Sequence, residues 1–239
     1  MTFKGREFKV MKQLQAVECI RLMKKNYTYK YLSSLYNIPD TVLCRYVKGM
    51  LLPNYEMAKQ IVNRTLRYLN DIVRSKIDID KQGIINTVEL MSDVNLLNII
   101  AYMIAEEYIQ EGVSKILTTI NCVPLATLVA EKIKASLIIA KNLKDVGVKN
   151  FIEESYSLVS LPMQATLYVP SNLLSTDDKV LILNDVLRSG RTLKALVNIV
   201  RKANAKIAGI YALIAVGSEW KKVVSELQIP KVKILVKVY

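Results

Sequence analysis

The order of apolar patterns after residue 84 is the feature that most restricts the fold. Short runs rich in Val, Ile and Leu alternate there with segments whose apolar residues recur at helical spacing. Parallel strands need crossover connections, and these are usually helices that cover both faces of the sheet. The alternation therefore predicts an α/β domain built around a parallel sheet.

The elements expected in this domain follow from that alternation. Strands are expected at residues 116–120, 135–140, 165–169, 180–183, 206–216 and 232–238. Helices are expected at residues 92–109, 125–133, 192–202 and 219–227. The strands are short and contain many β-branched residues, as buried strands of parallel sheets do.

The first third of the chain has helical patterns only. Helices are expected at residues 8–25, 28–36, 40–48 and 54–76. Thr28 and Asp40 are residue types that cap helix starts, and Gly49 is of the type that follows helix ends. We therefore expect an all-α region ahead of the sheet domain.

The charge is divided in the same way as these patterns. Residues 1–77 hold 15 Lys and Arg and 5 Asp and Glu, a net charge of +10, out of +13 for the chain. Residues 78–83 alternate in charge and contain a glycine, which indicates a linker. We predict a basic all-α domain at residues 1–77 and a sheet domain at residues 84–239. The asymmetry points to a polyanionic partner, although a basic surface without a partner is the alternative.

Histidine is absent, and this excludes several kinds of catalytic site. Ser-His-Asp triads, Cys-His pairs and zinc sites with His ligands all need an imidazole. The 3 cysteines are far apart, which fits a reducing cytoplasm and excludes a structural zinc knot. No apolar run is long enough to span a bilayer, and the charged N-terminus lacks a secretory signal. We expect a cytoplasmic protein without membrane contact.

Residues 28–49 have the form of a helix-turn-helix. Leu32, Ile38, Leu43 and Val47 fall where the two helices would pack against each other. The opposite face of the second helix would enter a major groove of DNA and carries Thr41, Cys44, Arg45 and Lys48. A plain helical bundle with a solvated basic face is the alternative.

The roles expected within this interface differ. Arg45 is the best candidate for reading a guanine edge, because a guanidinium can bond to guanine in two places. Lys30, Arg64 and Arg67 are better placed for phosphate contacts, which set affinity rather than sequence preference.

The segment YKYLSSLYNIPDTVLCRYVKGMLLPNYEMA, residues 29–58, resembles a known module. It looks like the helix-turn-helix of archaeal transcriptional regulators that carry a type I phosphoribosyltransferase domain similar to orotate phosphoribosyltransferase. The resemblance implies double-stranded DNA as a partner, and a homodimer. A dimer would read a palindromic promoter site whose half-sites lie about 34 Å apart.

The stretch VLILNDVLRSGRT, residues 180–192, runs from a buried strand through a short turn into a helix. Backbone N–H groups of a Ser-Gly turn at a helix start form an anion site by geometry alone. The hydroxyl groups of Ser189 and Thr192 can add hydrogen bonds. Asp185, at the carboxyl end of the strand, can accept hydrogen bonds from sugar hydroxyl groups. An ordinary strand-to-helix turn is the alternative.

This stretch is similar to the signature with which type I phosphoribosyltransferases bind phosphoribosyl pyrophosphate (PRPP). The resemblance implies that Asp185 is the second of two acids that hold the ribose hydroxyl groups. It also implies a 5-phosphate loop that contains Arg188, Ser189, Gly190, Arg191 and Thr192. Asn184 stands in place of the first acid and lacks its charge, so we expect weaker ribose or metal binding.

Two further segments match this family. Residues 121–126, NCVPLA, look like its pyrophosphate loop, with Cys122 in place of the usual glycine and Val123 after it. Residues 140–147, AKNLKDVG, resemble the PRPP-binding run of orotate phosphoribosyltransferases, in which Lys141 and Lys144 match. Residues 150–161, with Tyr156 and Ser157, are placed like the mobile cover of such a site.

Two functions from different classes follow. The first is a DNA-binding transcriptional regulator whose second domain binds PRPP or a related nucleotide as effector without turnover. It requires no cofactor, although Mg²⁺ can accompany PRPP. The second is an active orotate or purine phosphoribosyltransferase with an accessory helix-turn-helix. RNA binding ranks below both because the aromatic motifs of RNA-binding folds are absent.

Overall fold

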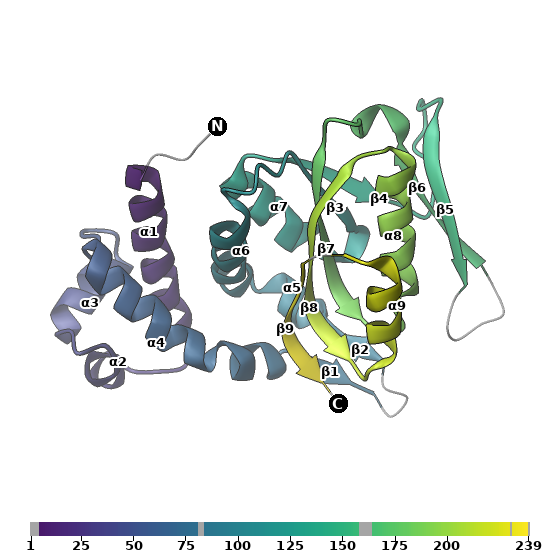
Figure 1. Cartoon of the computed structure of the whole chain (residues 1–239). Helices are drawn as coiled ribbons and strands as arrows, with labels where there is room; N and C mark the ends of the chain where they lie inside the picture. Colours follow the sequence, from purple (N-terminus) through teal and green to yellow (C-terminus); the bar gives the residue numbers. More distant parts are fainter. Residues whose placement is uncertain (1–4, 81–83, 158–163, 230, 239) are drawn as a thin grey trace. The chain divides into compact units, whose positions relative to one another are not determined.

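We describe a computed structural model of the chain at residues 5–80, 84–157, 164–229 and 231–238 (Figure 1). The chain forms two compact units, Met1–Glu106 and Glu107–Tyr239. The first unit is mostly helical, and the second contains the parallel sheet that the alternation of patterns predicts. No helix among the described residues is long and apolar enough to cross a bilayer.

The first unit begins with four helices packed on one core. They are α1 (Gly5–Lys24), α2 (Tyr29–Tyr36), α3 (Asp40–Val47) and α4 (Tyr55–Arg74). Leu32 and Leu43, which we expected between α2 and α3, are fully buried, and Ile38 is 4% exposed. Tyr36 and Thr65 share a buried hydrogen bond of 2.8 Å between their hydroxyl groups. The four predicted helices and their packing are confirmed.

The helix starts follow the sequence with one exception. The side chains of Thr28 and Asn54 cap α2 and α4, as their residue types predict. The prediction that Asp40 caps α3 is wrong, because Pro39 is the N-cap and Asp40 is already helical. The Pro39 ring fixes φ near the observed −53°, which suits a helix entry. The Asp40 carboxylate instead accepts from the N–H of Thr41 at 2.8 Å.

A short hairpin and two helices complete the first unit. Strand β1 (Asp78–Ile79) lies within the expected linker at residues 78–83 and pairs antiparallel with β2 (Ile85–Asn86), which follows it. Residues 81–83 lie outside the described chain. Helix α5 (Val88–Ser92) follows, and then α6 (Val94–Tyr108), which runs past the end of the unit.

The second unit contains a five-stranded parallel sheet in the order β4-β3-β7-β8-β9. Its strands are β3 (Lys115–Thr119), β4 (Ser136–Ala140), β7 (Lys179–Leu187), β8 (Lys206–Val216) and β9 (Val232–Val238). Its helices are α7 (Val123–Ile133), α8 (Arg191–Lys202) and α9 (Glu219–Leu227), with the short 3₁₀ turns η1 (Ile120–Cys122) and η2 (Ser171–Leu173). This confirms the α/β prediction.

The strand order reverses direction between β3 and β7. From β3 the chain crosses to β4 on one side, and from β7 it crosses to β8 and β9 on the other. Right-handed crossovers then place α7 on one face of the sheet and α8 and α9 on the opposite face (Figure 1). Such a reversal leaves a crevice at the carboxyl ends of the two central strands, where open α/β sheets bind ligands.

An antiparallel hairpin stands beside this sheet. Strand β5 (Phe151–Ser157) pairs with β6 (Gln164–Pro170) over their full lengths. The polar segment at residues 150–161, expected as an irregular cover, is therefore a strand as far as Ser157, and residues 158–161 lie outside the described chain. Alternate β5 residues are half-buried, because only one face of the strand is covered.

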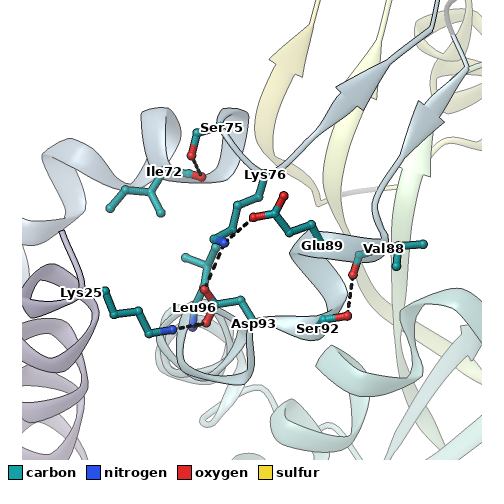
Figure 2. Close-up of polar contacts among 9 residues, drawn as sticks. All are labelled: Lys25, Ile72, Ser75, Lys76, Val88, Glu89, Ser92, Asp93 and Leu96. Atoms are coloured by element: carbon teal, nitrogen blue, oxygen red, sulfur yellow. Dashed lines mark hydrogen bonds and ion pairs between the residues drawn. The ribbon is translucent and has the colours of Figure 1, made fainter.

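Asp93, just before α6, connects three parts of the first unit (Figure 2). Its Oδ1 accepts from Lys25 Nζ at 2.9 Å and from the N–H of Leu96 at 3.2 Å, and its Oδ2 lies 3.4 Å from Lys76 Nζ. Lys76 also pairs with Glu89 at 2.8 Å. Burial alone would raise the pKa of Asp93, but the bonds from Lys25 and Leu96 and the charge of Lys76 hold it below its usual value.

We predict that Asp93→Asn lowers the free energy of unfolding at pH 7 by about 1–3 kcal/mol. Because the folded pKa of Asp93 is lowered, its contribution is present above the unfolded pKa and is lost as pH falls through the folded one. Urea unfolding at several pH values measures this. Glu89→Gln is the matched control and costs less than about 1 kcal/mol, because Glu89 is 69% exposed. A difference that persists undiminished at acidic pH would contradict the prediction.

Candidate functional site

The edge of the sheet at the carboxyl ends of β4, β3 and β7 brings together the predicted ligand residues from three strands. The carboxyl ends of β4, β3 and β7 are followed by Lys141, by η1 and by Arg188, respectively. Because these strands are parallel neighbours, their ends share one edge of the sheet. Thr118 on β3 donates its hydroxyl to the carbonyl of Leu183 on β7 at 2.9 Å, beside the ladder that joins the strands.

The β7–α8 connection has the geometry of an anion site. Strand β7 continues to Leu187, further than the sequence predicts, and α8 starts after Gly190. Gly190 has φ +78°, a conformation that favours glycine. Ser189 and Thr192 are half-buried beside it, and Arg188 and Arg191 are exposed. The first N–H groups of α8 lack helical partners, so an anion can bind them.

Helix α9 packs closely against this turn. A Cβ on Gly190 would lie 2.9 Å from the Cβ of Val223 on α9. Glycine is therefore required at this position twice, for its backbone conformation and for the close approach of α9. Val223 lies far along the chain, so the sequence has no signal that links it to the loop.

The two residues of the expected acid pair have different environments. Asn184 is 3% exposed and donates its side-chain N–H to the carbonyl of Val186 at 2.8 Å. Asp185 is 9% exposed, and burial raises the pKa of its carboxyl. Hydrogen bonds from the N–H groups of Val186 and Asp185 and from the Asn121 side chain offset this only in part. Asp185 is thus the acidic residue of the pair, and the Asn184 side chain bonds to the backbone of its own strand.

The segment expected as a pyrophosphate loop is helical in the structure. The turn η1 leads into α7, of which Val123 is the first residue. Cys122 is fully buried at an ordinary φ of −97°, so the backbone does not need glycine there. Burial, together with the charge of Asp185, raises the pKa of its thiol. Asn121, which we did not single out from the sequence, is exposed at the edge of the crevice.

Lys141 and Lys144 both have acidic partners. Lys141 Nζ lies 2.6 Å from Asp145, four residues along. Lys144 Nζ lies 3.2 Å from Glu153 of β5 and 4.9 Å from the ring centre of Tyr168 on β6. A ligand phosphate would therefore have to compete with these carboxylates. Among the described residues, no three Cys, Asp or Glu side chains gather as a metal site.

The predicted DNA-binding residues lie on the first unit. Five of the seven are exposed: Lys30, Thr41, Arg45, Lys48 and Arg67. Cys44 is half-buried on the same helix as Arg45. Arg64 is half-buried, and its guanidinium donates to the carbonyl of Leu35 at 2.5 Å, so it bonds within the unit. A DNA phosphate would have to displace that bond.

Comparison with known proteins identifies the second half of the chain. Residues 87–235 match the phosphoribosyl transferase domain. The chain belongs to this family. The five-stranded parallel sheet and the turn at Gly190 are therefore parts of a phosphoribosyl transferase domain, which the resemblance of residues 180–192 implied.

Several relatives have known activities. The chain is 34% identical over 121 residues to xanthine phosphoribosyltransferase of Streptococcus uberis, and 31% identical over 121 residues to that of Streptococcus equi subsp. zooepidemicus. Each alignment covers 49% of this chain and 62% of the relative. The chain thus matches less than two thirds of the length of these relatives.

Solved structures of the same fold are adenine phosphoribosyltransferases. The enzyme of Giardia lamblia, complexed with 9-deazaadenine, has a TM-score of 0.62 and 16% identity and covers 73% of this chain and 98% of its own. That of Rhodothermus marinus has a TM-score of 0.60 and 16% identity, with 72% and 99% covered. At this identity the likeness shows the fold alone.

We predict that Gly190→Ala lowers the free energy of unfolding by about 2–3 kcal/mol, because it adds a steric clash to backbone strain. Gly217→Ala is the matched control, since Gly217 has φ +60° but a Cβ added there would have no neighbouring atom within 4 Å. Gly217→Ala adds backbone strain but no steric clash, so it lowers the free energy of unfolding by about 1 kcal/mol. Urea unfolding of the full chain measures both. If both variants lost the same free energy of unfolding, Val223 would move aside at no energetic cost and the prediction would be wrong.

Proposed function

We propose that the second unit transfers a 5-phosphoribosyl group from PRPP to a purine base. The family match and the xanthine phosphoribosyltransferase relatives support this function. They support it better than the effector-binding regulator without turnover that we expected from the sequence. The observation that carries the proposal is the pairing of Asp185 with the anion-binding turn at Gly190, on the same sheet edge.

The chain's own groups fit such a transfer. In the reaction a base nitrogen bonds to C1 of the ribose, while the bond from C1 to pyrophosphate breaks and its electron pair leaves with pyrophosphate. The proton of that base nitrogen passes to the leaving pyrophosphate or to water. The N–H groups at the start of α8 would bind the 5-phosphate, and Asp185 would accept hydrogen bonds from the ribose hydroxyl groups. The reaction needs positioning and charge neutralisation more than a strong base, so it does not require histidine.

The replacement of an acid by Asn184 leaves Asp185 as the residue of the pair that could face Mg²⁺. With Asn184 neutral, Asp185 is the acid of the pair that can face a cation. One carboxylate with substrate phosphates is a usual donor set for Mg²⁺, which binds few protein groups and keeps several waters. Mg²⁺ bound to PRPP would neutralise charge on the leaving pyrophosphate.

A direct assay tests the transfer. With PRPP and Mg²⁺, we expect turnover of at least one of xanthine, guanine, hypoxanthine and adenine, followed by release of pyrophosphate. Asp185→Ala lowers kcat/KM at least about 10²-fold, because an acceptor for the ribose is lost. Asp177→Ala removes an exposed aspartate just before β7 and leaves the rate unchanged. Absence of turnover with every base would overturn the proposal.

A second function concerns the first unit. We propose that it binds double-stranded DNA, as a dimer on a palindromic site. The supporting observation is the exposed side of α3, where Thr41, Arg45 and Lys48 stand on a region of charge +10. Their exposure leaves them available to a groove, as recognition helices require.

Binding to DNA from the chain's own promoter region tests this function. We expect the affinity to fall steeply with salt, because Lys and Arg release counterions from phosphates. Arg45→Ala reduces the preference for the specific sequence by about 1–3 kcal/mol. Lys59→Ala, which removes a cation already paired with Glu56 on α4, changes it little. Salt-independent binding, or an unchanged preference in Arg45→Ala, would contradict the proposal. Fluorescence anisotropy measures both.

A further inference from the structure

A cavity of about 370 Å³ lies between α8 and strand β5, and it shares Arg191 with the turn after β7. Its size is within the range of small-molecule sites. The helix contributes Arg191, Lys194, Ala195 and Asn198, and the strand contributes Glu154, Ser155, Tyr156 and Ser157. These residues include two cations, a carboxylate and an amide. Of the three residues with hydroxyl groups, Ser155 already bonds to Thr166 of β6 at 2.8 Å.

Hydrogen bonds hold the two walls of this cavity together at both ends. At the start of α8, Arg191 donates to the carbonyl of Ser157 at 3.3 Å. Further along the helix, Asn198 donates to Glu154 at 2.7 Å, and Lys202 Nζ donates to the carbonyl of Glu153 at 2.6 Å. The cavity is therefore formed before any ligand binds, which lowers the entropic cost of binding.

The one carboxylate among the lining residues, that of Glu154, is already paired with a lysine. Glu154 lies 2.6 Å from Lys202 Nζ and is only 18% exposed. Burial acts to raise the pKa of Glu154, but its bonds with Lys202 and Asn198 outweigh this and hold the pKa below its usual value. Glu154 thus stays ionised and bonded to α8, and the positive charge of Lys202 offsets its repulsion of an anion.

The two cations of the lining are placed where an anion would be favourable. Arg191 and Lys194 lie at the N-terminal end of α8, whose first turn contains no acidic residue. The helix dipole is positive at this end, so cations here are unfavourable unless an anion is near. Lys194 pairs with Glu226 at 3.9 Å, with both side chains about half exposed, and such a pair is weak. Its charge also acts on Glu154 of the lining, which bonds directly to Lys202 and Asn198.

We propose that this cavity is a second anion site, which binds the phosphate group of a small molecule. Lys194 and Arg191 would contact the phosphate, and Asn198 and Tyr156 would border the rest of the ligand. Arg191 directly follows Gly190, so a ligand here acts on the same helix start that forms the turn after β7. The site suits an effector rather than the reacting PRPP, and it therefore goes beyond the proposed transfer.

Amide chemical shifts of the full chain, titrated separately with inorganic phosphate, AMP and adenosine, test this site. Ala195 and Tyr156 report on the cavity, and Ser189 and Thr192 report on the turn after β7. We expect phosphate and AMP, but not adenosine, to shift the cavity residues. Lys194→Ala raises the Kd measured at the cavity residues about tenfold and leaves the Kd at the turn unchanged. Lys194→Glu abolishes the cavity response.

Lys222→Ala is the matched control, because it removes an exposed lysine from α9 and leaves the cavity intact. A response to AMP with none to phosphate would place the nucleoside, not the phosphate, at the centre of recognition and would overturn the proposal. Shifts confined to the turn, or an unchanged cavity Kd in Lys194→Ala, would overturn it as well. Turnover and the response of the turn report on the proposed transfer, so the two proposals fail separately.

Discussion

The reversal of strand order between β3 and β7 is the constraint on which the rest of the sheet unit depends. It sends α7 to one face of the sheet and α8 and α9 to the other, which leaves a crevice at the carboxyl ends of the two central strands. The bond from Thr118 to the carbonyl of Leu183 fastens these strands at that edge. Asp185 and the turn at Gly190 meet η1 there because β3 and β7 are neighbours in space, although they are distant in the chain.

The polar and charged side chains at this edge of the sheet have different partners. Burial isolates Asp185 from solvent, whereas the Asn184 amide bonds to the backbone of its own strand. The lysines after β4 are paired with carboxylates of their own connection and of the hairpin. Backbone N–H groups, which carry no compensating counterion, are therefore the donors most readily available to a phosphate at this edge. Side chains then adjust affinity around a site whose geometry is set by the main chain.

Much of this arrangement follows from local sequence, and the rest depends on distant contacts. The helices of the first unit and the strands of the sheet were predictable because each has a strong apolar period, as in Leu32 and Leu43. Strand β5 was not recognised, since its covered face includes Glu154, whose partners Asn198 and Lys202 come from a helix that the sequence does not link to it. The extension of β7 beyond Asp185 is set by pairing with β8, as in Val186 with Ile214. The role of Val223 behind Gly190 is likewise a matter of tertiary packing.

In helix α6 the boundary of the family match and the boundary of the compact units do not coincide. It lies within the residues that match the phosphoribosyl transferase domain, yet as far as Glu106 it belongs to the compact helical unit. Its apolar residues are buried around its circumference, as Leu96, Leu97, Ile99 and Ile100 are all at 0% exposure. Residues 87–106 therefore count toward the family by sequence and toward the helical unit by packing. A shortened chain that began at Glu107 would lose part of the sequence that defines the family.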